Sequence, residues 1–566
     1  MPYSAGLAVA VLIVVGWFKP DIGDRWLRAL EDRASRVARK RRLAVVAVGL
    51  AAVFARLALL PLQPVPLPVI HDEFSNLLAA DTFTHGRLTN PPHPMSVFFD
   101  TFHVLQHPTY ASKYPPAAGA ELAIGQVLGH PWIGTLLGLA AMCMAITWML
   151  QGWFPAPWAL LGASLAVLRM CFFNYWFDGY FGASVAALGS AVVLGSYPRI
   201  VHSGRGRDAV LLGVGAVLLA SSRPLEGFVF CLPIAIALGF GRLSRRKPAL
   251  PDGLRCLWPT IVVLSLGLVF LGYYNWRLTN HPLLSPYVLY HREYFNYPFF
   301  AWQGPRAPLH YANPQFETFF NVWHRTEFRL SWSAWARRAI RACRHWWYVY
   351  LGLPLTIPFL ALPRIIRDRK MGLPVLQFAV GAAGLWSVVW FQPHYAAPLV
   401  ATLFVLLVQA MRHLRQFECR ERPVGIYLTR LVLLLAIDWV VVLAGQAVGH
   451  PSTPWTAARA QITEQLQSTP GEHLVLVEYA LNHNVHHEWV YNAADIDGSR
   501  IVWAREIPGQ DLGPLLAYFR NRKIWVVSAD ASPPTIREYR ARSPWSCCPQ
   551  DCLEDRGRAQ SVNTCF

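Results

Sequence analysis

Residues 42–83 read RLAVVAVGLAAVFARLALLPLQPVPLPVIHDEFSNLLAADTF, and this stretch joins an apolar run to a cluster of titratable side chains. Residues 43–61 are mostly aliphatic and have about the 20-residue length that a helix needs to cross a bilayer. His71, Asp72 and Glu73 follow soon after the run ends. The stretch therefore predicts a membrane span that delivers three titratable groups to one membrane surface.

The composition of the whole chain agrees with a membrane protein. Of its 566 residues, 54% are hydrophobic and only 15% are charged, and the mean hydropathy is +0.29. A soluble domain has a more polar balance. The formal net charge of +18 would suit nucleic acid, but the basic residues gather in short loops between apolar runs, as cytoplasmic loops of membrane proteins do. We expect no nucleic-acid partner.

Apolar runs near spanning length recur through the first 445 residues and predict about 12 transmembrane helices. The predicted spans are residues 4–18, 43–61, 132–150, 156–173, 179–196, 209–221, 227–241, 258–274, 346–362, 373–391, 395–411 and 427–445. The first is short enough for a signal-like anchor, but no small-residue cleavage site follows it, so we expect it to be retained. Residues 117–129 are predicted to form an interfacial or re-entrant helix.

Loop charges predict the orientation. Nine basic residues lie between the first two predicted spans, and the positive-inside rule places that loop in the cytoplasm. Alternation then places four more basic loops there, those that contain Arg205, Arg245, Arg367 and Arg415. Residues 62–131, 275–345 and everything after 446 are thus expected on the outer, periplasmic or exterior side of the cytoplasmic membrane.

Residues 446–566 differ in character from the transmembrane domain at 1–445. Three short apolar runs predict buried strands and one amphipathic run predicts a helix: HLVLVEY (473–479), RIVWARE (500–506) and KIWVVSA (523–529), with DLGPLLAYFRNRK (511–523) as the helix. The fold class expected is an all-α polytopic membrane protein with a small C-terminal α/β exoplasmic domain.

Four of the ten cysteines lie near the C-terminus, at Cys547, Cys548, Cys552 and Cys565. An even number in an outer domain favours one or two disulfides, and a metal site is the alternative. The histidines of the first outer loop match no established zinc spacing. The metal content is therefore unknown from sequence, and a divalent cation is left open as a cofactor.

The predicted topology brings polar residues from distant segments to one depth at the outer side. They are Arg56, Lys113, Arg169, Asp178, Arg223, Glu226, His394 and Tyr395. Ionisable groups at the edge of a bilayer are costly unless they are paired or used. Carboxylates beside cations at this depth suit a lipid phosphate, because Arg and Lys hold the phosphate and a carboxylate serves as general base toward an attacking hydroxyl or amine.

The residues around Asp72 also have a purely structural interpretation. Asp72 lies where an N-cap belongs, Glu73 complements the helix dipole, and His71 is solvated. Phe74, Leu77, Leu78 and Phe83 give a rough apolar stripe, so this helix is predicted to lie along the membrane surface and to end near Gly86.

The acidic pair Asp72 and Glu73 at the start of the first outer loop, the later Tyr114-Pro115-Pro116, a dozen spans and a soluble C-terminal domain together resemble the GT-C glycosyltransferases. The branch most similar contains the protein mannosyltransferases, the aminoarabinose transferases and the Rgt-type enzymes. The resemblance covers residues 43–412 in organisation.

This resemblance implies an inverting transferase that passes a sugar from a polyprenyl-phosphate donor to an exoplasmic glycan, lipid or protein. It implies that Asp72 is the base and that Glu73 supports it or contacts acceptor or metal. Lys113 is similar to a lysine that meets the donor phosphate, although aminoarabinose transferases commonly carry Glu-Lys-Pro where this chain has Ser112-Lys113-Tyr114. Arg56, Arg169 and Arg223 are further candidates for the phosphate, and Tyr114, Glu226, His394 and Tyr395 for substrate.

Two other functions use similar features. A lipid-linked-sugar flippase or transporter also needs spans, cations and an apolar groove, although such proteins usually show paired halves, and no internal repeat is visible here. A catalytically inactive scaffold for envelope assembly is the second alternative.

Overall fold

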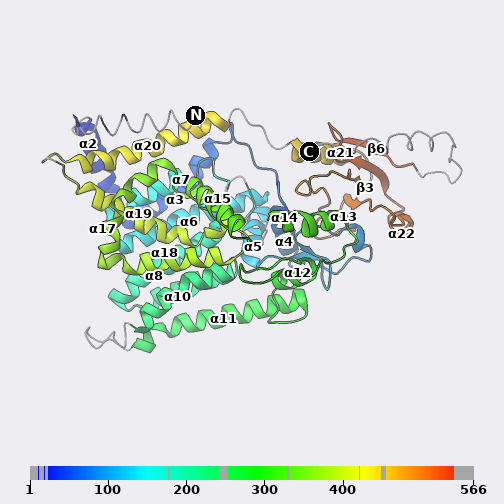
Figure 1. The fold of residues 1–566 in the computed structure, drawn as a ribbon, viewed down its shortest axis with the longest axis horizontal. Helices are drawn as coiled ribbons and strands as arrows, with labels where there is room; N and C mark the ends of the chain where they lie inside the picture. Colours follow the sequence, from blue (N-terminus) through cyan, green and yellow to red (C-terminus); the bar gives the residue numbers. More distant parts are fainter. Residues whose placement is uncertain are drawn as a thin grey trace.

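The computed structural model is mostly helical, with a small sheet region toward the C-terminus. It describes residues 23–175, 179–240, 253–327, 331–419, 421–447 and 454–540, together with residues 11, 14, 18 and 19. Long helices lie side by side at one end of the molecule and the sheet lies at the other end, with short helices and loops between them (Figure 1).

Helices occur at each of the eleven predicted spans that the structure describes. The bundle contains α2 (Asp24–Arg39), α3 (Arg41–Ala58), α6 (Pro131–Trp153), α7 (Ala156–Met170), α8 (Ala183–Ser203), α9 (Gly206–Ala220), α10 (Pro224–Phe240), α11 (Gly253–Thr279), α18 (Gly372–Ser387), α19 (Leu399–Arg415) and α20 (Val424–Ala447). The predicted span 346–362 is broken into α15 (Trp332–Tyr350), α16 (Gly352–Thr356), η3 (Ile357–Ala361) and α17 (Leu362–Arg367).

Not every helix of the bundle is long enough to cross a membrane alone. Among the described residues, four helices are long and apolar enough, namely α6, α8, α11 and α20. A fifth is added if α15 and residues 352–367 form one span, bent by 97°. The predicted number of about 12 spans is thus unconfirmed, because most of the remaining helices have only 15 to 18 residues. Most of the predicted span 4–18 and the loop with Arg245 lie outside the described residues.

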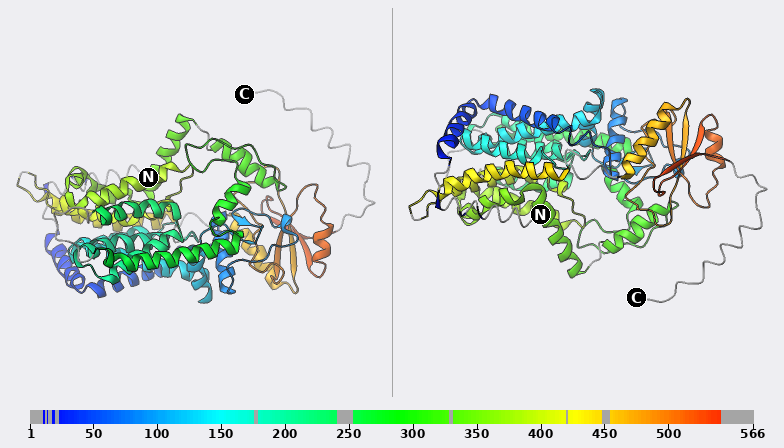
Figure 2. Two further views of the ribbon diagram at one scale, coloured as in Figure 1. Left: turned by 90° about the horizontal axis from the view of Figure 1, so that it is seen from below. Right: turned by 90° about the horizontal axis from the view of Figure 1, so that it is seen from above.

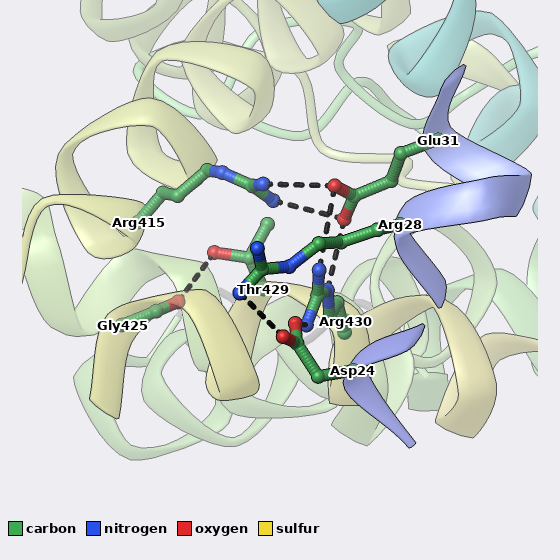
Figure 3. Close-up of polar contacts among 7 residues, drawn as sticks. All are labelled: Asp24, Arg28, Glu31, Arg415, Gly425, Thr429 and Arg430. Carbon is green, nitrogen blue, oxygen red and sulfur yellow. Dashed lines mark hydrogen bonds and ion pairs between the residues drawn. The ribbon is translucent and has the colours of Figure 1, made fainter. Parts of the chain in front are cut away.

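Helix α2 is fastened to the bundle by a network of ion pairs (Figure 3). The Arg430 guanidinium contacts Asp24 Oδ1 at 2.7 Å and Glu31 Oε1 at 2.9 Å, and Arg415 Nη2 contacts Glu31 Oε2 at 3.0 Å. Arg28 also pairs with Asp24. These contacts tie the amphipathic N-terminal helix to α19 and α20 at the end of the bundle opposite the sheet (Figure 1).

The C-terminal domain is a small α/β unit. It contains α21 (Pro454–Ser468), β3 (His473–Glu478), β4 (Ile501–Arg505), α22 (Gly513–Tyr518), β5 (Lys523–Ser528) and β6 (Thr535–Glu538). The strand order is β4-β3-β5-β6, with β3 parallel to β4 and β5, and β6 antiparallel to β5. All three predicted strands and the predicted helix are found. The edge strand β6 is mostly exposed, and its sequence has no apolar run that would predict a strand. The four C-terminal cysteines lie outside the described residues.

Short elements connect the bundle to the sheet. They are α4 (His71–Thr84), η1 (Ser96–Phe98), β1 (Val104–Leu105), β2 (Ala111–Ser112), α5 (Pro116–Val127), α12 (Pro286–Tyr294), α13 (Pro314–Phe316), η2 (Glu317–Trp323), α14 (His324–Glu327), η4 (Arg369–Met371) and η5 (Pro393–Ala396). With 12 residues, α5 is too short to span, in keeping with the interfacial or re-entrant helix predicted at 117–129.

Helix α4 corrects two predictions. Nine of its 14 residues are buried, so it does not lie along a membrane surface with one face in water. Phe74 stacks on Tyr491 of the C-terminal domain, with ring centroids 4.1 Å apart, while Ala79 packs against Gly119 of α5. The N-cap is Ile70 rather than Asp72. Packing from two sides, which the apolar pattern of one helix does not reveal, accounts for the difference.

The contact of α5 with α6 generates a stability prediction. A Cβ at Gly125 would lie 2.1 Å from the backbone nitrogen of Gly134, so the two helices meet backbone to backbone. Gly125→Val should therefore push α5 from α6 and lower the free energy of unfolding by about 1–3 kcal/mol, the usual cost of overpacking. Gly445→Ala in α20 is the matched control, because nothing lies within 4 Å of its added Cβ. Thermal unfolding in detergent measures both, and equal melting temperatures would contradict the packing described.

Candidate active site

A cavity of about 380 Å³ lies where the bundle, the short connecting elements and the C-terminal domain meet. Five residues predicted from the sequence line it: Asp72, Lys113, Tyr114, His394 and Tyr395. The rest of the wall is largely aromatic and imidazole, and includes His71, His103, Tyr287, His291, Phe295, Trp323, Trp390 and His486. A few charged groups thus face a pocket whose walls are mostly rings.

Asp72 occupies the first turn of α4, where the helix N-terminus favours negative charge. Its Oδ1 accepts a hydrogen bond from the Tyr114 hydroxyl, and its Oδ2 lies 3.8 Å from His103 Nε2. Burial raises the pKa of Asp72, but the charge of Lys113, the neighbouring His394 and the Tyr114 hydroxyl outweigh burial and hold that pKa below its ordinary value. The carboxylate is therefore ionised at neutral pH.

Lys113 is a buried cation that reaches Asp72 through His103. Its Nζ lies 2.8 Å from His103 Nδ1, so His103 stands between the ammonium and Asp72. Burial lowers the pKa of Lys113 to about 7, against the attraction of Asp72. Four aromatic rings surround the ammonium with centroids 4.8–5.6 Å from Nζ, a cation–π arrangement formed by Tyr114, Tyr287, Tyr290 and Phe295.

His103 is a site residue that sequence reasoning missed. The antiparallel register pairs Val104 with Ser112, which places His103 beside Lys113. Its backbone is left-handed, with φ of 65°; its carbonyl accepts from Ser75 Oγ at 2.6 Å and its N–H donates to the Tyr290 hydroxyl at 2.8 Å. Burial lowers the pKa of His103 well below its ordinary value, so the ring is neutral. A two-residue strand pair leaves no periodic signal in the sequence.

Arg223 approaches Asp72 from the turn between α9 and α10. It lines a small neighbouring pocket that shares Asp72, Tyr114 and His394 with the main cavity. Its guanidinium carbon lies 4.4 Å from the centroid of the Tyr395 ring. The structure thus brings Arg223 and Tyr395 together and places both beside the carboxylate.

His394 faces both pockets. Its Nδ1 is 3.0 Å from the Tyr175 hydroxyl, while its buried Nε2 has no hydrogen-bond partner among the residues that the structure describes. Burial, and then the charge of Arg223, lower the pKa of His394 to about 3. A neutral ring with one unused nitrogen can exchange a hydrogen bond with a bound polar molecule.

Three predicted cationic or acidic residues lie elsewhere. Arg56 donates to the carbonyls of Gln63 and Pro64, at 2.9 and 3.2 Å, and packs over Trp132. Arg169 lies beside Trp439, 5.9 Å from the centroid of its ring. Neither arginine lines the cavity, nor does Glu226, which stands in the first turn of α10 and interacts with Arg223. Asp178 falls outside the described residues.

Glu73 is not part of the cavity wall, and its carboxylate accepts hydrogen bonds from three backbone N–H groups. Its Oε2 accepts from the N–H of Val69 at 2.7 Å and of Ile70 at 3.2 Å, and its Oε1 accepts from the N–H of Tyr180 at 2.8 Å. Burial raises the pKa of Glu73 to about 7 although these hydrogen bonds oppose the rise. Glu73 thus joins the start of α4 to the segment before α8.

The C-terminal domain forms part of the cavity wall. His71 is buried and not solvated as predicted. Its Nδ1 lies 2.9 Å from the hydroxyl of Tyr491, which belongs to the C-terminal domain. His486 lines the cavity with its ring centroid 5.8 Å from that of His71. Asp81 accepts from the N–H of Ala494 at 2.7 Å, a further contact between the two parts. Sequence reasoning gave this domain no place in the site, since its contribution depends on how two folded parts dock.

The described residues contain no group of three His, Cys, Asp or Glu side chains that could hold a metal ion. The described residues therefore identify no site for a divalent cation.

Comparison with family models and with curated proteins finds no match. Among solved structures, the chain is similar to the oligosaccharyltransferase of Archaeoglobus fulgidus tethered with an acceptor peptide (13% identity, 86% of this chain and 69% of the other, TM-score 0.49). It is also similar to ArnT from Cupriavidus metallidurans bound to undecaprenyl phosphate (14% identity, 86% and 92%, TM-score 0.44) and in the apo state (14%, 87% and 93%, TM-score 0.45). Likeness this distant does not establish the family or the activity of this chain.

The geometry separates the roles of two adjacent carboxylates. Glu73→Gln replaces an acceptor of three backbone N–H groups by an amide that carries its own donors, so it should lower the free energy of unfolding by about 1.5–3 kcal/mol. Asp72→Asn, which keeps an oxygen for the Tyr114 hydroxyl, should unfold near the wild-type temperature. Thermal unfolding of the purified variants measures the difference. A Glu73→Gln protein of unchanged stability would disprove the structural role.

Proposed function

We propose that the chain is an inverting glycosyltransferase that moves a sugar from a polyprenyl-phosphate donor to an exoplasmic acceptor, with Asp72 as general base. One observation carries the proposal: an ionised, partly buried carboxylate shares its pocket walls with Lys113 and Arg223 at the end of an apolar helix bundle. A base beside cations is what transfer from a phosphate-linked donor requires.

The reaction is a single displacement. The acceptor hydroxyl or amine gives its proton to Asp72 as its oxygen or nitrogen bonds to the anomeric carbon. The bond from that carbon to the phosphate oxygen breaks, and the phosphate leaves with the electron pair. Because a phosphate is a stable anion, no second carboxylic acid is needed to protonate the leaving group, unlike in glycoside hydrolysis. Attack opposite the leaving group inverts the anomeric configuration.

The surrounding side chains prepare this step. The Tyr114 hydroxyl and His103 orient the Asp72 carboxylate, and the positive charges of Lys113 and Arg223 oppose the charge that develops on the phosphate. The aromatic walls offer faces on which a sugar ring stacks. The volume of about 380 Å³ lies within the range of small-molecule sites.

Removal of the base tests the function. Asp72→Asn should lower turnover by about 10²–10⁴-fold while donor binding is retained, because the amide cannot accept the proton. Sugar release from labelled polyprenyl-phosphate donor, with and without acceptor extract, measures turnover, and binding of the donor to purified protein is measured in parallel. Full activity in the variant would exclude Asp72 as the base, whereas a wild-type protein that releases no sugar would favour a transporter or a scaffold.

The role of Lys113 in donor binding can be tested through the pH dependence of kcat/KM. The pKa of Lys113 is about 7, so its positive charge is present below that pH and is lost as the pH rises through it. We expect kcat/KM for the donor to fall above about pH 7, since kcat/KM reports the free enzyme. Bound phosphate favours the charged form, so kcat should fall only at higher pH. Lys113→Arg, which stays charged, should lack the fall in kcat/KM; a profile unchanged by this substitution would remove Lys113 from donor binding.

A further inference from the structure

Helix α15 presents an apolar stripe that no part of the described protein covers well. Trp332, Ala336, Ile340 and Cys343 recur every three or four residues and therefore share one face, which ends at the half-buried Trp347. Trp332 is 86% exposed and Ile340 is 70% exposed. The protein packs instead against a different face, where Ala334 and Ala342 are buried. Figure 2 shows the helix inclined away from the bundle.

Arginines run beside this stripe. Arg337, Arg341 and Arg344 follow the same spacing on the adjoining face, and all three are exposed. Residues 275–345 contain nine Arg and only three Glu, with no Lys or Asp. Such an excess is unusual for a loop predicted on the outer side, where the positive-inside rule expects few basic residues. The arginines are therefore better explained by binding than by topology.

The position of α15 also points to the bilayer. The helix turns by 97° into residues 352–367, so the two segments do not form one straight span. Leu360 in that segment is 73% exposed, as a side chain that contacts lipid would be. At this same end, the last turn of α15 contributes His345, Tyr348 and Val349 to the cavity wall. With residues 352–367 directed into the bilayer, a helix at 97° to them lies close to the plane of the membrane surface.

We propose that α15 is an interfacial helix that binds an anionic phospholipid surface. Its apolar stripe enters the boundary between headgroups and acyl chains, and Arg337, Arg341 and Arg344 contact lipid phosphates. A stripe of Trp and Ile with basic residues alongside is the pattern of helices that lie in this boundary. Because the helix also lines the cavity, the lipid contact sets the height of the cavity rim. The inference does not depend on the proposed transfer reaction.

Cys343 provides a probe on the stripe itself, since its thiol is free and exposed. The full-length protein is reconstituted in phosphatidylcholine vesicles that contain phosphatidylglycerol and labelled with an environment-sensitive fluorophore. The signal from position 343 is the difference between this protein and labelled Cys343→Ser. A matched aqueous control is Cys343→Ser with Leu481→Cys, because Leu481 of the C-terminal domain is fully exposed. Brominated lipid should quench the probe at 343 several-fold more than the probe at 481, and iodide should do the reverse.

The charge is tested in the same protein. The double variant Arg337→Gln, Arg344→Gln should reduce lipid quenching at position 343. Vesicles of phosphatidylcholine alone should reduce it likewise. The double variant Arg337→Lys, Arg344→Lys keeps both charges and should retain most of the quenching in anionic vesicles. Added salt should weaken the contact, since it screens exposed charges. Equal quenching by iodide at 343 and 481 would overturn the proposal and leave the stripe to a protein partner. Lipid quenching that ignores both headgroup charge and the Gln substitutions would also overturn it.

Discussion

The structure depends on how a carboxylate and an ammonium are kept charged away from water. An isolated ion in an apolar interior costs far more than a fold can supply, so buried ions survive only when they are paired or hydrogen-bonded. Asp72 and Lys113 meet this condition through His103, which stands between them, and through Tyr114 and a ring of aromatic faces. The segments that supply these groups therefore meet at one site.

The positive charge of Lys113 is only partly balanced by Asp72, which leaves the site able to attract a further anion. The pKa of Lys113 falls to about 7 because burial outweighs the attraction of Asp72, so the ammonium gains stability when a further anion arrives. The same burial leaves His394 neutral, with a buried ring nitrogen that has no hydrogen-bond partner among the described residues. An anionic, hydrogen-bonding ligand, such as the phosphate of the proposed donor, would satisfy both groups together.

Apolar periodicity was sufficient to predict the helices and the three buried strands, because burial in lipid or in a parallel sheet leaves long runs of aliphatic residues. It could also place Asp72, Lys113, His394 and Tyr395 at a common depth. It could not tell Asp72 from Glu73, since adjacent residues of a helix differ in direction by about 100° and only the packing decides which one faces the pocket. Arg56 and Arg169 lie away from the cavity for a related reason: equal depth does not bring two side chains to the same side of a bundle. His103 and His486 were missed because a short strand pair and a domain contact bring them in.

The docking of the C-terminal domain on α4 has a consequence for biogenesis. The hydroxyl that holds His71 and the ring that stacks on Phe74 both belong to Tyr491, and another wall residue is His486. A ribosome releases these residues after all the bundle helices, so the nascent chain carries Asp72 for most of its synthesis without a finished pocket around it. Maturation of the pocket is thus delayed until the last part of the polypeptide has emerged and folded.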